Sequence, residues 1–301
     1  MKISSTNPLV SVAIITFNQK KFLQECIESV LKQDYKNLEI VVADDASTDG
    51  TCELLYAYEA KYPGKFVVRI AKSNQGITKN SNAAHFSCSG KYIAWMGGDD
   101  LMLPGKIAIQ VALMENEEDV VINYHDLDAF DSNSGRTLHL LSQSNKPRQG
   151  GTSVLVKHGP FNGACSTMVR RSATPIDGFD ERLPIASDWL YWVQSTYGGG
   201  KISYTNKILG KYRRHENNVT RADDGPNLKN MQDHMLTCSI ILSEMPEYFN
   251  EIKYRIAELL IVMRLYQNKK KYNKYLGASL AFSLRPKAVA GMLFSILGRK
   301  R

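Results

Sequence analysis

The apolar positions of the N-terminal third of the chain form two alternating patterns. Continuous β-rich runs occupy residues 10–16, 38–43, 66–71 and 92–96, as is typical of buried parallel strands. Apolar side chains recur at helical spacing over residues 22–31, and residues 51–62 also predict a helix. Strands that alternate with helices in this way predict a parallel sheet covered by helices.

The pattern loosens after this region. Strand-like runs are expected at 120–130, 137–141, 166–172 and 201–215, with a short helix at 187–197. From residue 228 the spacing is helical, over 228–245 and 251–267, and two short apolar runs between 276 and 297 follow, broken at 285–287. We therefore expect an α/β domain with a mixed, mainly parallel sheet over 1–220 and a helical extension over 221–301.

Polar clusters follow three of the predicted strands. They are "TFN" at 16–18, "DDASTDG" at 44–50 and "GGDD" at 97–100. In open α/β sheets, ligands bind beyond the carboxyl ends of the strands. The three clusters are therefore expected to form one binding site at a shared edge.

The pair Asp99–Asp100 is the strongest chemical signal in these clusters. Adjacent carboxylates repel each other, whereas Mg²⁺ or Mn²⁺ prefers such oxygen ligands, and Gly97 and Gly98 would let the backbone approach a bulky ligand. The chain contains no glycine-rich phosphate loop, so a cation would be needed to neutralise a phosphorylated ligand. The alternative is an ordinary surface turn before Pro104.

Charge is concentrated at one end of the chain. Residues 259–301 hold ten basic side chains and no acidic one, which leaves 28 basic against 30 acidic side chains elsewhere. This near-neutral body argues against nucleic acid, and the basic tail predicts contact with an anionic membrane surface. Packing of the tail on the domain, or formation of a homo-oligomer, is the alternative.

The five scattered cysteines favour reduced thiols. The apolar run after Lys2 is expected to be the first strand and not a signal peptide. Both features predict a cytoplasmic protein that can sit peripherally at the inner face of the cell membrane.

Four segments resemble inverting glycosyltransferases of family 2. "VSVAIITFNQKKFLQECIESVLKQDYKNLEIVVADDASTDGT" resembles the opening of the family, and "NQGITKNSNAAHFSCSGKYIAWMGGDD" resembles the segment that ends in its metal motif. "GFDERLPIASDWLYWVQSTYGG" is similar to the stretch with the catalytic base, and "GKYRRHENNVT" to the closing Y-R-x-H element. The resemblance implies a GT-A fold and a nucleotide-sugar donor, with a UDP-sugar as the expected one. It also implies a saccharide or lipid-linked saccharide acceptor, as in bacterial surface-polysaccharide assembly.

The resemblance also implies roles for individual residues on the donor side. Thr16 and Asp45 would contact a uracil-type base, with Asp44 supporting them. Asp99 would lie near the ribose or the Mn²⁺ or Mg²⁺ ion, and Asp100 would be the main metal ligand.

On the acceptor side, Asp188 would be the general base and Trp189 would line the acceptor pocket. Asp188 is also placed to cap a helix. Arg213, Arg214 and His215 are implied at the leaving diphosphate, with His215 also a candidate metal ligand or a loop histidine with a structural hydrogen bond.

Three positions depart from the family pattern. Ala46 stands where glycine is usual, Gly97 where a third Asp is frequent, and Ser187 where Glu is common. No essential carboxylate is lost, which disfavours a non-catalytic, membrane-associated binding module as the alternative function. A sugar-phosphate nucleotidyltransferase, a second alternative, would need a glycine-rich loop after the first strand, where "TFNQKK" stands.

Overall fold

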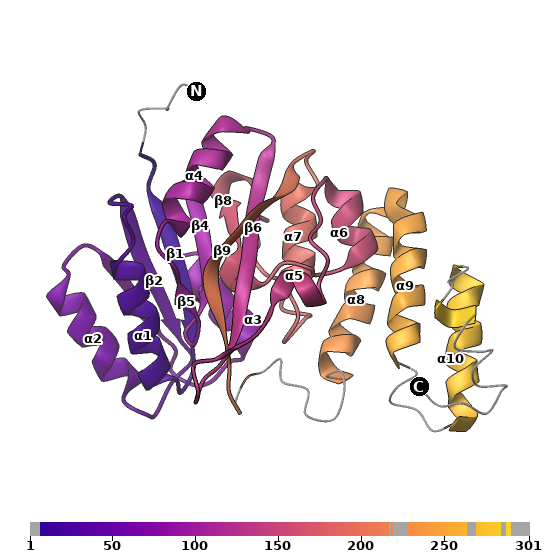
Figure 1. Ribbon diagram of the computed structural model, residues 1–301, viewed down its shortest axis with the longest axis horizontal. Helices are drawn as coiled ribbons and strands as arrows, with labels where there is room; N and C mark the ends of the chain where they lie inside the picture. Colours follow the sequence, from indigo (N-terminus) through magenta and orange to yellow (C-terminus); the bar gives the residue numbers. More distant parts are fainter. Residues whose placement is uncertain (1–6, 217, 219–227, 264–268, 284–286, 290–301) are drawn as a thin grey trace. The chain divides into compact units, whose positions relative to one another are not determined.

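The computed structural model describes residues 7–216, 218, 228–263, 269–283 and 287–289 (Figure 1). The chain divides into two compact units. The first comprises Met1–Thr152 and Pro160–Asn218, and the second comprises Ser153–Gly159 and Val219–Arg301.

The first unit is built on a sheet whose parallel part contains all four strands predicted in the N-terminal third. These are β1 (Val10–Thr16), β2 (Leu38–Asp44), β3 (Phe66–Ile70) and β4 (Tyr92–Gly97). They lie in the order β3-β2-β1-β4 and are parallel to one another. Their carboxyl ends therefore share one edge, as predicted.

The sheet continues from β4 through β8, β6, β9 and β5. These strands are β8 (Met168–Arg170), β6 (Val120–Asp131), β9 (Lys201–Arg214) and β5 (Leu101–Met102), and β7 (Thr137–Leu140) pairs with β6. β8 is antiparallel to both β4 and β6, whereas β6 and β9 are parallel. The prediction of a mixed, mainly parallel α/β sheet is confirmed.

Helices cover both faces of this sheet (Figure 1). Apolar side chains of α1 (Lys20–Leu31), α2 (Thr51–Lys61) and α4 (Lys106–Asn116) share one core with alternate residues of β1, namely Val10, Val12 and Ile14. On the other face, Trp95 of β4 contacts Tyr191 of α7 (Asp188–Thr196) edge to face. α3 (Ile77–His85) and the short helix α5 (Leu141–Ser144) complete the unit's α-helices in the described residues, and two 3-10 helices lie at Ala164–Ser166 and Arg171–Ala173.

The second unit is helical. It contains α6 (Thr152–His158), α8 (Leu228–Glu244), α9 (Phe249–Met263) and α10 (Lys269–Phe282). Ser153 Oγ donates to Glu251 Oε1 at 2.9 Å, and Ser279 Oγ donates to the Ala257 carbonyl at 2.8 Å, so polar contacts tie α6 and α10 to α9. The predicted helices at 228–245 and 251–267 correspond to α8 and α9.

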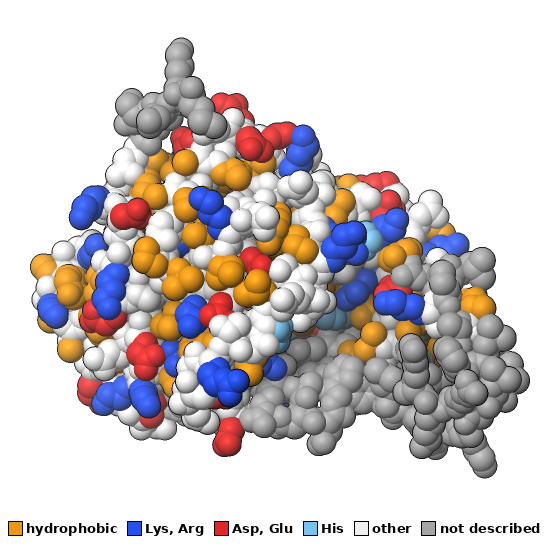
Figure 2. All heavy atoms as spheres, viewed as in Figure 1, with side chains coloured by type: hydrophobic (Ala, Val, Ile, Leu, Met, Phe, Trp, Pro, Cys, Tyr) orange, Lys and Arg blue, Asp and Glu red, His pale blue; other side chains and the backbone are white. Residues whose placement is uncertain are grey.

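The apolar runs expected between 276 and 297 lie largely outside the described residues. Among the helices that the structure describes, none has the length and hydropathy required to cross a bilayer. On the face of the molecule drawn in Figure 2, basic and acidic side chains are interspersed, in keeping with the near-neutral charge of the body.

Candidate functional site

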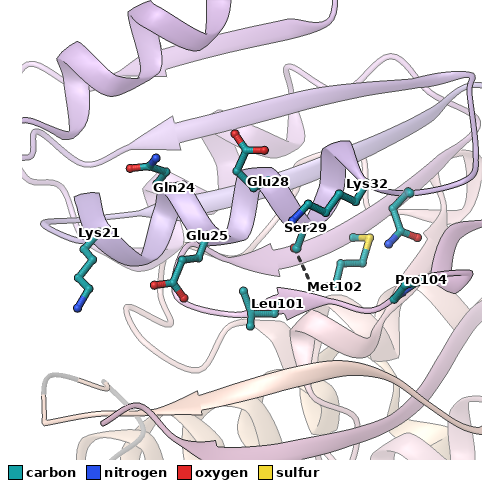
Figure 3. Close-up of a pocket in the computed structure, with 10 residues that line it drawn as sticks. Lys21, Gln24, Glu25, Glu28, Ser29, Lys32, Leu101, Met102 and Pro104 are labelled. Carbon is teal, nitrogen blue, oxygen red and sulfur yellow. Dashed lines mark hydrogen bonds between the residues drawn. The ribbon is translucent and has the colours of Figure 1, made fainter. Parts of the chain in front are cut away.

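A hollow of about 530 Å³ lies between α1 and the segment that follows the Asp pair (Figure 3). Lys21 and Lys32 stand towards its two ends, with Glu25 and Glu28 between them. None of the residues predicted for the functional site lines this hollow. The site is therefore built at the carboxyl ends of β1, β2 and β4.

Hydrogen bonds hold these three strand ends together. The buried Asn80 of α3 donates through Nδ2 to the carbonyls of Thr16, at 3.3 Å, and Ala43, at 3.0 Å. Gly98 N–H donates to the Ile15 carbonyl at 2.9 Å, which joins the loop after β4 to β1. Hydrogen bonds therefore link the three strand ends at the shared edge that the strand pattern predicted.

Asp44 shapes the turn after β2. Its carboxylate accepts the Ser47 backbone N–H at 2.9 Å and the Ser47 hydroxyl at 2.5 Å. Ala46, at the centre of this turn, has a φ of 63°, in the left-handed region that favours glycine. This conformation explains why glycine suits the position in related sequences and agrees with a supporting role for Asp44.

Asp45 holds the start of α3. Its two carboxylate oxygens accept the backbone N–H groups of Gln75 and Gly76 at 2.7 and 2.9 Å, and the side chain is buried. Each oxygen keeps a second lone pair. A contact between Asp45 and the base of a nucleotide, as implied by the resemblance, stays a prediction, and so does one from the buried Thr16, whose hydroxyl donates to Gln19.

The turn 97–100 directs both carboxylates to one point. A Cβ atom placed on Gly97 would lie 2.7 Å from Asp99 Oδ1 and 3.2 Å from Asp100 Oδ2. Burial, followed by the repulsion of Asp99, raises the pKa of Asp100 well above its usual value. A side chain at residue 97 would meet both carboxylates in this arrangement, and glycine leaves the space between them open.

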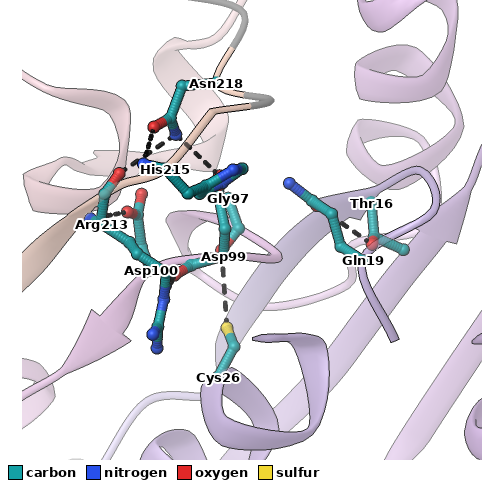
Figure 4. Close-up of polar contacts among 9 residues, drawn as sticks. All are labelled: Thr16, Gln19, Cys26, Gly97, Asp99, Asp100, Arg213, His215 and Asn218. Carbon is teal, nitrogen blue, oxygen red and sulfur yellow. Dashed lines mark hydrogen bonds and ion pairs between the residues drawn. The ribbon is translucent and has the colours of Figure 1, made fainter. Parts of the chain in front are cut away.

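The end of β9 closes over this turn (Figure 4). His215 Nε2 lies 2.9 Å from Asp99 Oδ2, and Asn218 Nδ2 donates to the same oxygen at 3.2 Å. His215 and Asp99, both implied as metal ligands, therefore lie within hydrogen-bond distance of each other, and a metal contact from either one stays a prediction.

Arg213 does not fit its predicted role at the diphosphate. Its side chain is only 4% exposed and its guanidinium pairs with Glu25 Oε2 at 2.5 Å. Arg214, the next candidate, is partly buried and lies with its guanidinium over the Tyr212 ring at 5.6 Å. The sequence could not predict that Arg213 is buried and paired, because its partner Glu25 lies in α1, far away along the chain.

Asp188 is the first residue of α7 and is partly buried. Desolvation raises the pKa of its carboxyl to about 6. Its neighbour Ser187 lies 3.0 Å from the Thr78 hydroxyl of α3, which also donates to the Leu183 carbonyl at 2.5 Å. Through α3, the segment that carries Asp188 is thus tied to the loop held by Asp45.

Trp189, which the resemblance implied would line the acceptor pocket, lies in the interior of the first unit. Its side chain is completely buried, as are Leu190 and Tyr191 beside it. The run "DWLYW" is apolar on every side after its first residue, so most of α7 is buried inside the first unit, and only Asp188 and Gln194 of this helix are partly exposed.

Lys106 is a buried charge that sequence reasoning missed. Its amine donates to the Cys165 carbonyl at 2.6 Å, and desolvation lowers its pKa to about 8. Asp100 is among the groups that act on it electrostatically. Lys106 directly follows the turn residues Pro104 and Gly105, and nothing in this sequence indicates that its side chain points into the core.

The residues of the turn fit a divalent cation. Asp99 Oδ1 and Asp100 Oδ2 converge over Gly97, and their mutual repulsion would be relieved by a positive charge between them. Among the described residues, no group of three or more His, Cys, Asp and Glu side chains is arranged to hold a metal by itself. A cation here would need oxygen ligands from a bound phosphate or from water, which is usual for Mg²⁺.

Comparison with solved structures gives the class to which this fold corresponds. The structure of S. aureus TarS 1-349 in complex with UDP-GlcNAc superposes with a TM-score of 0.67 over 96% of this chain and 87% of that one, at 18% identity. The mannosyltransferase PcManGT of Pyrobaculum calidifontis, in complex with GDP-Man and Mn²⁺, gives 0.62 over 98% and 81%, at 16% identity. The fold is that of the GT-A glycosyltransferases, as the resemblance implied.

Sequence comparison gives the family. The model of glycosyl transferase family 2 matches residues 11–175, and the chain belongs to this family. EpsE of Bacillus subtilis (strain 168), which is named as a glycosyltransferase, is 32% identical over 169 residues. That match covers 56% of this chain and 59% of EpsE, so it spans only part of the relative's length.

Proposed function

We propose that the first unit is a glycosyltransferase domain that transfers a sugar from a nucleotide-sugar donor, with inversion and with the help of Mn²⁺ or Mg²⁺. The observation that carries this proposal is the convergence of Asp99 Oδ1 and Asp100 Oδ2 at the edge where β1, β2 and β4 end. Membership of family 2 supports it. A UDP-sugar is the proposed donor, since a structural neighbour is a complex with UDP-GlcNAc.

In the proposed donor site, two loops would contact different parts of the nucleotide. Asp44 and Asp45 shape the loop after β2, where the base would lie beside Thr16. The ribose and diphosphate would lie towards Asp99 and Asp100, with His215 and Arg214 at the rim. A bound divalent cation would supply charge stabilisation for the leaving diphosphate, and the two Asp carboxylates would hold it.

The acceptor side depends on Asp188. With a pKa of about 6, its carboxylate is deprotonated at neutral pH and basic enough to accept a proton. The acceptor hydroxyl gives its proton to Asp188, its oxygen forms the bond to the anomeric carbon, and the bond to the nucleoside diphosphate breaks. A single displacement of this kind inverts the anomeric centre.

We propose that the acceptor is a saccharide or a lipid-linked saccharide, and that the second unit brings the protein to the cytoplasmic face of a membrane. Ten basic and no acidic side chains over residues 259–301 support this placement. Self-association through the same unit is the competing use of its helices.

The donor proposal is tested by screening nucleotide sugars for release of free nucleoside diphosphate, with Mn²⁺ and with a chelator. UDP-GlcNAc, UDP-glucose, UDP-galactose and GDP-mannose form a suitable panel. We expect cation-dependent release from at least one UDP-sugar and its loss in Asp188→Asn. Release only from GDP-mannose would reject the UDP proposal, and equal release in the chelator would reject the metal requirement.

A further inference from the structure

The buried side chain of Arg213 does not fit a direct contact with a diphosphate, but its hydrogen bonds indicate a different role. We propose that Arg213 is a positioning residue, which orders the 97–101 turn through the Asp99 carbonyl and orients the Asp100 carboxylate, while His215 and Asn218 hold the Asp99 carboxylate. This inference deepens the proposed function, on which its metal-binding consequence rests.

Two bonds from Arg213 hold the Asp pair from the β9 side (Figure 4). Its backbone N–H donates to Asp100 Oδ1 at 3.0 Å, and its side-chain Nε donates to the Asp99 carbonyl at 2.7 Å. One residue therefore fixes both the peptide between the two acids and the orientation of the second carboxylate.

The carboxylate oxygens that Arg213 and His215 do not contact are the ones that converge. Arg213 occupies Oδ1 of Asp100, and His215 occupies Oδ2 of Asp99. Asp100 Oδ2 and Asp99 Oδ1 are left turned towards the point over Gly97, at 3.2 and 2.7 Å from it. The end of β9 thus orients both carboxylates, together with Asn218 at Asp99 and with the Cys165 side chain, which also hydrogen-bonds to Asp100.

The guanidinium is itself fixed by three side chains. It lies 4.7 Å from the ring centroid of Phe22 and 4.9 Å from that of Phe130, and it pairs with Glu25. Stacking between two rings combined with a carboxylate pair suits the planar guanidinium and not a lysine ammonium. Glu25 also lines the hollow beside α1 (Figure 3), so α1 is coupled to the turn through Arg213.

The test compares Arg213→Lys with Arg170→Lys in the full chain. Arg170 is a suitable control because it also stacks on a ring, that of Tyr92, and donates to backbone carbonyls, but it holds the end of α4. The first readout is hydrogen exchange of the 97–101 amides without metal. The second is Mn²⁺ affinity, measured from the electron paramagnetic resonance signal of free Mn²⁺.

For Arg213→Lys we expect faster exchange at 97–101 and Mn²⁺ binding weakened about 10–100-fold, as for other residues that orient metal ligands. Arg170→Lys is expected to leave both readouts unchanged. Equal effects in the two variants, or faster exchange with unchanged Mn²⁺ affinity, would overturn the proposal.

The experiment remains decisive in two further cases. If wild-type protein binds no Mn²⁺, the metal part of the proposed function fails, whereas the exchange comparison still decides whether Arg213 orders the turn. If Arg213→Lys does not fold, Glu25→Gln replaces it, since this change leaves Arg213 in place and removes the partner charge. Glu25→Gln is expected to speed exchange at 97–101 and weaken Mn²⁺ binding to a smaller degree, and no change in either would overturn the proposal.

Discussion

At the residue scale, Asp188 shows how partial burial prepares a carboxylate for proton transfer. A surface Asp would be too weak a base near neutral pH, but desolvation brings the pKa of this one to about 6. Proton uptake as the pH falls through that value would remove the form that acts as the base in the proposed reaction.

We expect kcat/KM to be constant above this pH and to fall about tenfold per pH unit below about 6. Asp188→Asn should lose turnover by a factor of about 10² or more while keeping UDP affinity, because the amide fills the same space without acting as a base. A pH–rate profile and nucleotide titration of the variant measure these effects. An acidic limb near pH 4, or an active Asp188→Asn variant, would contradict the assignment.

Gly98 gives a second residue-scale prediction, because the strand ends approach closely there. A Cβ atom on Gly98 would lie 2.9 Å from both Cβ and Oγ1 of Thr16. We expect Gly98→Ala to lower the free energy of unfolding by about 1–3 kcal/mol and to weaken UDP binding. Gly198→Ala is the matched control, since a Cβ atom at Gly198 meets nothing within 4 Å. Equal urea midpoints for the two variants would contradict the close packing at Thr16.

At the scale of elements, the two loops after β1 and β2 each contain a non-glycine residue with positive φ. Ala46 has φ 63° and Asn18 has φ 51°. The two positions differ because Asn18 Oδ1 accepts the Thr48 N–H at 2.8 Å, whereas alanine has no polar side chain to compensate for the strain.

We therefore expect Ala46→Gly to raise the free energy of unfolding by about 0.5–1 kcal/mol. Asn18→Gly should lower it by about 1 kcal/mol, because the Thr48 N–H loses its acceptor. Urea denaturation of both variants tests this pair. A rise in both variants would show that backbone conformation alone governs these loops, and a fall in both would show that glycine relieves no strain at residue 46; either result would contradict this pair of predictions.

Element by element, the strands were predictable and several helices were not. Buried parallel strands are continuous apolar runs, so β1, β2, β3 and β4 could be read directly. α3, with the sequence "ITKNSNAAH", was missed because most of its buried side chains are polar and serve hydrogen bonds, such as those of Asn80, and not a hydrophobic face. Helix α4 and the short strand β5 were also not predicted.

The same contrast holds within the site. The meeting of residues 16–18, 44–50 and 97–100 followed from strand order, which the alternating pattern determines. Strand order did not predict the burial of Trp189 or the positioning role proposed for Arg213. Both depend on tertiary packing, such as the contact of Arg213 with Phe22 and Glu25 in α1, which no local pattern encodes.

At the scale of the whole molecule, the unequal distribution of charge is the main feature beyond the site. Vesicle binding tests whether the basic tail meets a membrane. We expect co-sedimentation with phosphatidylserine-containing vesicles, weakened by salt and reduced by roughly 1 kcal/mol for each of Arg299, Lys300 and Arg301 changed to Gln. Equal binding to pure phosphatidylcholine vesicles, or none to either kind, would contradict a role in membrane attachment.

The proposed function rests on Asp99 and Asp100 holding a cation against a nucleoside diphosphate. Calorimetric titration of UDP, with and without Mn²⁺, is the decisive experiment. Asp100→Asn is the sharpest variant, since an amide oxygen can still accept the Arg213 N–H while an NH₂ group replaces the oxygen turned to the site. We expect UDP binding to wild type to require Mn²⁺ and to be lost in Asp100→Asn. UDP binding of equal strength with and without Mn²⁺, or unchanged in the variant, would contradict this expectation.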